Sequence, residues 1–292
     1  MASKVERVAK LAMGLGEKHL AAYGAARSRH DFTQKQLMAC LVLRAYLKTT
    51  YRGVVDLLSG HQKLREALGM EDKVPHYTTL QKFSARSNVL AIADAMIGQI
   101  GEAALRMQGR KEKAVAVAID ATGMETTTAS AHFMSRAGRT HRKWAKASVA
   151  LVCGCLFPIG LAMGWGPSND KSQAEELLDK SLGNRPLNCL PQSLYGDAAF
   201  DADWIHALCR EEWGVESIIK PSRTRSDGSL GGSYRAAMTK EHLEKKGYGR
   251  RWHIESFFSG LKRTTGSALT ARSNDNLLKE AAIRVLAYSL NR

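Results

Sequence analysis

The first 110 residues place apolar side chains with the period of an α-helix. Residues 36–50 are the most apolar stretch, and Thr33 and Gln36 before it have the spacing of a capping box. Two short amphipathic stretches, residues 50–60 and 61–69, each end at a glycine, as helices often do. A second capping box, Thr78 to Gln81, predicts a helix over residues 80–87, and helical period returns over residues 88–107. The pattern predicts a helical N-terminal domain, residues 1–110.

After residue 112 the pattern changes to short apolar runs typical of β-strands. Such runs occupy residues 114–120, 146–157, 158–165, 193–197 and 215–220, with a break expected near Phe157 and Pro158. Amphipathic helices are predicted over residues 169–182, 201–214 and 276–292 and from Tyr248 onward, and a loop over the polar residues 221–247. This order predicts an α/β domain, residues 113–292, whose mixed sheet begins with an antiparallel meander.

The net charge of the chain indicates what kind of partner it binds. The 292 residues are 44% hydrophobic and 24% charged, as in globular proteins, with a net charge of +15. A field of this sign suits a polyanion such as DNA. Residues 1–110 carry 17 Lys and Arg against 9 Asp and Glu. Short helices ending in a basic one resemble a helix-turn-helix, but small helical bundles share the pattern, so both a DNA-reading and a scaffold role stay open.

Two features bear on the compartment. The first 25 residues are charged throughout, and no run approaches 18 apolar residues, so we expect neither a signal peptide nor a membrane span. Five cysteines form an odd, sparse set, which indicates reduced thiols in a cytoplasm rather than a disulfide framework. Cys153 and Cys155 are expected to alternate along a strand.

Three carboxylates are candidates for catalysis. Asp120 closes the run at 114–120, Asp197 closes the run at 193–197, and Glu255 lies on the helix that begins near Tyr248. Working residues of open α/β sheets lie at strand ends. Converging carboxylates would hold Mg²⁺ or Mn²⁺, and two such ions could promote phosphoryl transfer. The alternative is that both aspartates are ordinary turn residues.

The helix around Glu255 has a specific spacing. Tyr248, Arg251, Glu255 and Lys262 follow Y-x2-R-x3-E-x6-K and fall within a sector of roughly 60° on a helical wheel. A carboxylate flanked by cations suits a site that binds metal and phosphate together. The alternative is an exposed face with an ordinary Arg–Glu ion pair.

These residues resemble bacterial insertion-sequence transposases of the DDE class, which have an RNase H-like core. The four-residue spacing matches the signature of one large group of them, and IDATGME around Asp120 and YGDAAFDADW around Asp197 are similar to its aspartate motifs. Residues 50–83 also resemble the helical domain before this core. The resemblance implies an RNase H-like mixed sheet flanked by helices and preceded by a mainly helical domain. With 57 residues between Asp197 and Glu255, a large β insertion is not expected.

The resemblance also implies roles for single residues. Asp120, Asp197 and Glu255 would be the catalytic ligands of two Mg²⁺ ions, with Mn²⁺ able to substitute. Tyr248, Arg251 and Lys262 would contact phosphates near the transposon end. Trp252 would stack on an unpaired base, although a packing role is equally compatible with the sequence.

The resemblance implies cleavage of transposon ends and joining of the 3′-OH to target DNA. The expected partner is double-stranded DNA, bound by a homodimer associated with the bacterial nucleoid. Gln81, Lys82 and Arg86 have the spacing of residues that face one groove, so the N-terminal helices would select the transposon end. Two other functions stay open: a DNA-binding derivative without catalysis, repressor-like or decayed, and a metal nuclease without strand transfer.

Overall fold

The computed structural model describes residues 2–25, 27, 29–71, 73–111, 114–126, 143–183, 190–222 and 229–292. The chain forms two compact units. The helical unit comprises residues 1–96, 126–128 and 260–292, and the sheet unit comprises residues 97–125 and 129–259. This division differs from the expected boundary near residue 110 in two ways. Residues 97–110 belong to the sheet unit, whose core includes Ala104 and Leu105, and residues 260–292 belong to the helical unit.

The helical unit confirms the helical pattern at the start of the chain. It contains α1 (Lys4–His19), α2 (Gln34–Tyr46), α3 (Tyr51–Gly60), α4 (Gln62–Ala67), α5 (Tyr77–Ser84), α12 (Asn274–Asn291), the start of α6 (Val89–Gly109) and the end of α11 (Trp252–Thr265). Thr33 caps α2, and its capping box with Gln36 is formed as predicted. Helix α2 is buried on nearly all sides and packs against α1 and α12.

Helix α5 begins and ends earlier than its sequence predicts. His76, not Thr78, is the N-cap, and the helix ends at Ser84. The expected capping box does not form because the Thr78 hydroxyl lies 2.8 Å from Nδ1 of His76. Arg86 therefore lies in the turn after α5 and not on the helix.

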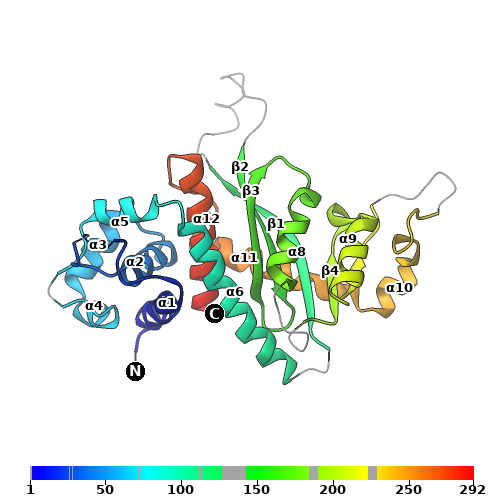
Figure 1. The fold of residues 1–292 in the computed structure, drawn as a ribbon, viewed down its shortest axis with the longest axis horizontal. Helices are drawn as coiled ribbons and strands as arrows, with labels where there is room; N and C mark the ends of the chain where they lie inside the picture. Colours follow the sequence, from blue (N-terminus) through cyan, green and yellow to red (C-terminus); the bar gives the residue numbers. More distant parts are fainter. Residues whose placement is uncertain are drawn as a thin grey trace, which may run out of the picture. The chain divides into compact units, whose positions relative to one another are not determined.

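The sheet unit confirms the predicted α/β class. Its described strands are β1 (Ala116–Glu125), β2 (Trp144–Val152), β3 (Phe157–Gly166), β4 (Ser193–Gly196) and β5 (Glu216–Ile219), in the spatial order β3-β2-β1-β4-β5 (Figure 1). β1, β2 and β3 form the antiparallel meander, while β4 pairs parallel to β1 and β5 pairs parallel to β4. This is the mixed sheet of an RNase H-like fold.

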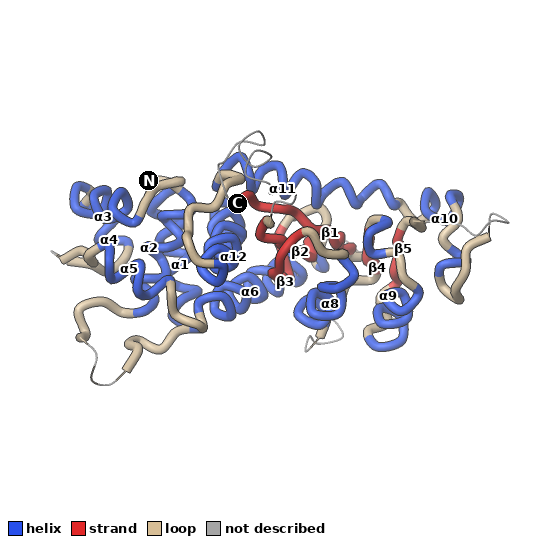
Figure 2. Tube along the Cα trace, turned by 90° about the horizontal axis from the view of Figure 1, so that it is seen from above, coloured by secondary structure: helices blue, strands red, loops and turns tan. Residues whose placement is uncertain are grey.

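Helices cover both faces of the sheet. Figure 2 shows α8 (Ala174–Leu182) and α9 (Asp203–Ala207) on one side of the strands and the first half of α11 on the other. Val117 and Ile119 of β1 belong to the core on the α8 side, with Leu177 of α8. Because side chains alternate along a strand, Asp120 projects toward the α11 side. The strand thus supports the core with one face and presents an acid on the other.

Two local predictions are wrong in the sheet unit, and a third, a helix over residues 201–214, is right except for its last turn. Residues 153–156 form a turn between β2 and β3, so Cys153 and Cys155 do not alternate along a strand. The turn occurs there because Gly154 and Leu156 adopt positive φ angles of 86° and 57°, which end the extended chain. The polar segment expected to be a loop contains α10 (Lys240–Lys245), which Thr239 caps. The helix expected at residues 201–214 is α9 followed by a π-helical turn, Leu208–Glu212.

Two findings concern the membrane and thiol predictions. No described helix is both long and apolar enough to cross a membrane. None of the four cysteines in the described part of the chain forms a disulfide bond, and Cys189 lies outside the described residues.

Candidate active site

The sheet register brings Asp120 and Asp197 to adjacent positions. β1 pairs with β4 through Ile119 opposite Gly196, and the next residues of the two strands are Asp120 and Asp197. Neighbouring strands lie about 4.8 Å apart, so the two acids are neighbours at the point where the parallel pairing ends. The sequence predicts that this strand ends at Asp120. In the structure β1 continues to Glu125, because β2 pairs with it as far as that residue. Asp120 is therefore at the end of the parallel pairing rather than at the end of its strand.

The carboxyl group of Asp120 is mostly buried and lies near other carboxylates. Its side chain is 16% exposed, and Oδ1 accepts a hydrogen bond of 2.7 Å from the amide of Ala121. Burial, together with the negative charges of Asp197 and Asp170, raises its pKa to about 6, against the opposing effects of the Ala121 amide and Arg251. A cation bound here would favour the ionised form.

Asp197 is fixed by the backbone that follows it. Its side chain accepts a hydrogen bond of 2.9 Å from the amide of Ala199 and caps the 3₁₀ turn Ala198–Phe200. A capping role is common for aspartate at such a position. Here it also fixes a half-buried carboxylate beside Asp120, so the turn interpretation and the catalytic interpretation of Asp197 are compatible.

Arg251 connects Asp120 to Glu255. Its Nη1 lies 3.2 Å from Oδ2 of Asp120, and its Nη2 forms an ion pair with Oε1 of Glu255, one helical turn later. The Glu255 side chain is 57% exposed, whereas that of Arg251 is 21% exposed. The ordinary Arg–Glu pair considered from the sequence is thus present. It extends to the aspartate on β1, which an isolated surface pair would not do.

Residues 248–262 carry the four-residue signature and are called the signature segment below. The start of this segment is anchored to the short parallel strands β4 and β5. The segment begins not as an α-helix but as a 3₁₀ turn, Tyr248–Arg251, and α11 follows at Trp252. The hydroxyl of Tyr248 donates to the carbonyl of Gly196 at 3.1 Å, and that of Tyr195 donates to the carbonyl of Lys246 at 2.8 Å. Burial raises the pKa of Tyr248, so its hydroxyl stays a donor at neutral pH.

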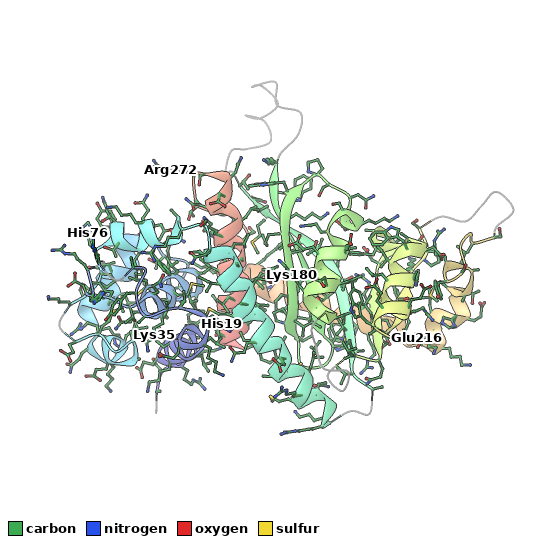
Figure 3. The ribbon with its side chains drawn as sticks, viewed as in Figure 1. His19, Lys35, His76, Lys180, Glu216 and Arg272 are labelled. Carbon is green, nitrogen blue, oxygen red and sulfur yellow. The ribbon has the colours of Figure 1, made fainter. Side chains whose placement is uncertain are left out.

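A salt bridge completes this anchor. The ammonium group of Lys246 lies 2.7 Å from a carboxylate oxygen of Glu216 on β5, which is labelled in Figure 3. The backbone that carries Arg251 and Glu255 is therefore tied to β4 and β5. This arrangement positions both side chains relative to Asp197.

The donor chemistry of the three acids fits a divalent cation. Mg²⁺ and Mn²⁺ prefer carboxylate oxygens, which Asp120, Asp197 and Glu255 supply. Among the residues that the structure describes, no three His, Cys, Asp or Glu side chains are gathered closely enough to hold a metal ion. A cation already lies between two of the acids, since the Arg251 guanidinium contacts both Asp120 and Glu255. The site thus stabilises positive charge where a metal ion is expected.

The comparison with known families agrees with this geometry. A family model described as the transposase DDE domain matches residues 111–290. The chain belongs to this family. No curated protein matches the chain. Transposases of this family bind and cleave DNA and generally use divalent metal ions. The match covers nearly the same residues as the predicted α/β domain.

Two further candidate DNA-binding residues of this DDE transposase lie on α11: Lys262 of the signature, and Trp252, which is not part of it. The Trp252 side chain is 56% exposed and stacks on the ring of His253, with ring centroids 4.4 Å apart. It is not packed in a core, so its surface is accessible for stacking. Lys262 is half-buried and follows Glu255 by seven residues, a rise of about 10 Å along the helix.

The three residues of the N-terminal region predicted to contact DNA differ in their surroundings. Gln81 and Lys82 are exposed on α5. Arg86 donates a hydrogen bond of 2.7 Å to Oε1 of Gln34, and its guanidinium lies 5.1 Å from the ring centre of Phe83. The structure thus leaves Gln81 and Lys82 accessible and gives Arg86 contacts within the helical unit.

Sequence reasoning missed a buried ion pair near the site. Lys146 of β2 is 4% exposed and pairs with Asp170, while its ammonium donates to the carbonyl of Ser168 at 2.8 Å. From its sequence context Asp170 is expected to be a structural helix cap, but Asn169 is the N-cap of the 3₁₀ turn. The charge of Asp170 instead contributes to the raised pKa of Asp120. The available signal was a lysine within the apolar run at 146–157, because a buried lysine requires a partner.

Proposed function

We propose that this transposase cleaves transposon ends and joins the freed 3′-OH to target DNA, with Asp120, Asp197 and Glu255 as its catalytic carboxylates. One observation carries the proposal. The register of β1 and β4 makes Asp120 and Asp197 neighbours, and Arg251 links Glu255 to the same point. Residues 113–292 would be the catalytic domain, and residues 1–110 the domain that binds the DNA end.

The three acids would hold two Mg²⁺ ions, with Mn²⁺ able to substitute. When bound, the ions supply Lewis-acid chemistry that activates the attacking oxygen and stabilises the leaving oxygen. Asp120 and Asp197 would act from fixed positions, because backbone amides hold both carboxylates. Glu255 would join them from the first turn of α11, where its side chain has room to reorient.

Cationic and aromatic side chains of the signature segment would hold the DNA. Arg251 and Lys262 would bind phosphates near the scissile bond, and Tyr248 would contact the same backbone. Trp252 would stack on an unpaired base, which its exposed ring allows. The net charge of +15 favours DNA through counterion release. Because two ends must be cut and joined together, we propose that the chain acts as a homodimer on DNA, at the nucleoid.

Single substitutions of the acids test this proposal. Asp120→Asn, Asp197→Asn and Glu255→Gln each remove a ligand charge while nearly preserving shape. We expect each to reduce cleavage of a linear duplex carrying the gene and its flanking DNA on the order of 10²–10³-fold, the loss typical of one group that stabilises charge in a transition state. Binding to the same duplex should persist. Cleavage and strand-transfer products would be separated on a denaturing gel.

The matched control is Glu175→Gln, because Glu175 is an exposed acid on α8. It should retain both products. Cleavage without any joined product in the wild-type chain would favour a metal nuclease. DNA binding without cleavage, in the wild type as in all three variants, would favour a non-catalytic derivative. Full activity in any one of the acid variants would remove that residue from the catalytic set.

A further inference from the structure

We propose that Arg251 is an exchangeable cation of this active site, which divalent metal displaces from Asp120 and Glu255 and which then binds a DNA phosphate. The inference rests on the proposed metal site. It adds that metal and DNA bind cooperatively, with Arg251 as the group that couples them.

The metal-free arrangement gives the first reason. One guanidinium contacts both carboxylates, through Nη1 to Asp120 at 3.2 Å and through Nη2 to Glu255. The same oxygen lone pairs are those that a divalent ion requires. Since two cations repel at contact distance, Arg251 and a metal ion exclude one another from these oxygens.

The side chains differ in how easily they can move. Asp120 is 16% exposed and accepts a hydrogen bond from Ala121, whereas Glu255 is 57% exposed. Three donors are not yet gathered among the described residues. Glu255 is therefore the acid that turns from Arg251 toward the two aspartates when metal binds.

The released guanidinium stays near the reacting phosphates. The 3₁₀ turn that carries Arg251 is anchored by Tyr248, which donates to the carbonyl of Gly196. The side chain can swing while its backbone remains in place. A guanidinium offers paired donors that match two phosphate oxygens, so phosphate is the natural replacement for the two carboxylates.

Calorimetric titration of the full-length chain with Mn²⁺, with and without a DNA duplex, tests the exchange. Without DNA, Arg251→Ala should bind Mn²⁺ roughly tenfold more tightly than wild type, within the range of typical coupling between sites. With DNA, wild type should gain more Mn²⁺ affinity than Arg251→Ala, by roughly tenfold, because only in wild type does DNA also draw Arg251 away from the carboxylates. Arg251→Gln is the second variant in case the alanine variant does not fold, as judged by thermal unfolding in EDTA.

Two control substitutions separate exchange from simple loss of charge. Arg250→Ala removes the neighbouring positive charge, and Arg106→Ala removes the arginine of a similar helical pair with Glu102. Both should leave Mn²⁺ affinity and its gain on DNA as in wild type. An equal increase for Arg250→Ala and Arg251→Ala would overturn the proposal, as would a DNA-dependent gain that is the same in Arg251→Ala and wild type.

The acid variants distinguish failure of the exchange from failure of the metal site. If Asp120→Asn and Glu255→Gln weaken Mn²⁺ binding but Arg251→Ala leaves it unchanged, the exchange is wrong and the metal site stands. If neither acid variant changes Mn²⁺ binding, the proposed metal site itself is wrong, and the exchange with it.

Discussion

The environment of Asp120 disfavours the ionised form of its carboxyl group. Burial and the nearby charges of Asp197 and Asp170 raise its pKa from 3.8 to about 6. Because the folded chain then binds more protons than the unfolded chain between about pH 4 and pH 6, stability falls as pH rises through this range. The shift corresponds to a cost of about 3 kcal/mol at most, fully present above pH 6.

Removing this charge should stabilise the metal-free protein. We expect Asp120→Asn to raise the free energy of unfolding at pH 8 by 1–3 kcal/mol in EDTA, of the order given by the pKa shift. The gain should shrink toward zero at pH 4, where the wild-type carboxyl is also neutral. Urea unfolding at the two pH values measures it. A variant no more stable than wild type at pH 8 would contradict the raised pKa of Asp120, in which the opposing effect of Arg251 is already included.

Residue chemistry was the most predictable part of the site. The sequence predicts the three acids and Arg251, because carboxylates bind divalent metal ions and cations bind phosphates. What the sequence could not reveal is the contact between Arg251 and Asp120, which are 131 positions apart. The pairing of Lys146 with Asp170 escaped notice for the same reason, since it depends on how β2 meets the turn after β3.

Secondary-structure elements were predictable where one pattern acts alone. The capping box of Thr33 and the antiparallel meander formed as the pattern indicated. Errors arose where a local contact competes with the pattern. His76 binds the hydroxyl of Thr78 and takes the N-cap position of α5 from it. β1 extends beyond Asp120 because β2 pairs with it through Glu125, and a strand's own sequence does not indicate its partner's length.

Helix α5 is proposed to select the transposon end, with Gln81 reading a base edge and Lys82 binding a phosphate. In the full-length chain, Gln81→Ala should reduce the preference for the terminal duplex over a scrambled one by roughly tenfold, the cost of one lost base contact. Lys82→Ala should weaken binding to both duplexes and reduce the salt slope by about one. Fluorescence anisotropy at several salt concentrations measures both effects.

Arg86 is proposed as a third DNA contact, although it would have to leave Gln34. Arg86→Ala should then lower DNA preference. It should also lower the melting temperature slightly, because it removes the contacts with Gln34 and Phe83. Lys63→Ala is the matched control, because Lys63 is exposed on α4, and it should bind as wild type does. Unchanged preference in Gln81→Ala and Arg86→Ala would contradict end selection by α5.

The division of the whole chain into units could not be read along the sequence. α12 lies at the C-terminus, yet it packs against α2 within the helical unit. Its buried stretch includes Glu280 and Arg284, a pattern that suggests exposure. Burial is possible because Glu280 pairs with Arg284 at 2.8 Å and with Arg44 of α2 at 3.7 Å. The pair with Arg44 joins residues far apart in the sequence, so local periodicity does not reveal it.

This packing decides how the helical unit should be studied. A fragment ending near residue 108 would lack α12 and leave the buried Arg44 without Glu280. An unpaired buried charge is strongly destabilising. DNA preference is therefore tested with point variants of the complete chain and not with an N-terminal fragment.

Asp120, Asp197 and Glu255 are proposed to form one metal site. The most direct measurement is anomalous X-ray diffraction from crystals of the full-length chain grown with Mn²⁺ and a DNA duplex. We expect anomalous peaks bounded by these three carboxylates, about 3.5–4 Å apart if two ions bind, with Arg251 turned toward a phosphate. Peaks elsewhere, with Glu255 still paired to Arg251 at saturating Mn²⁺, would contradict it.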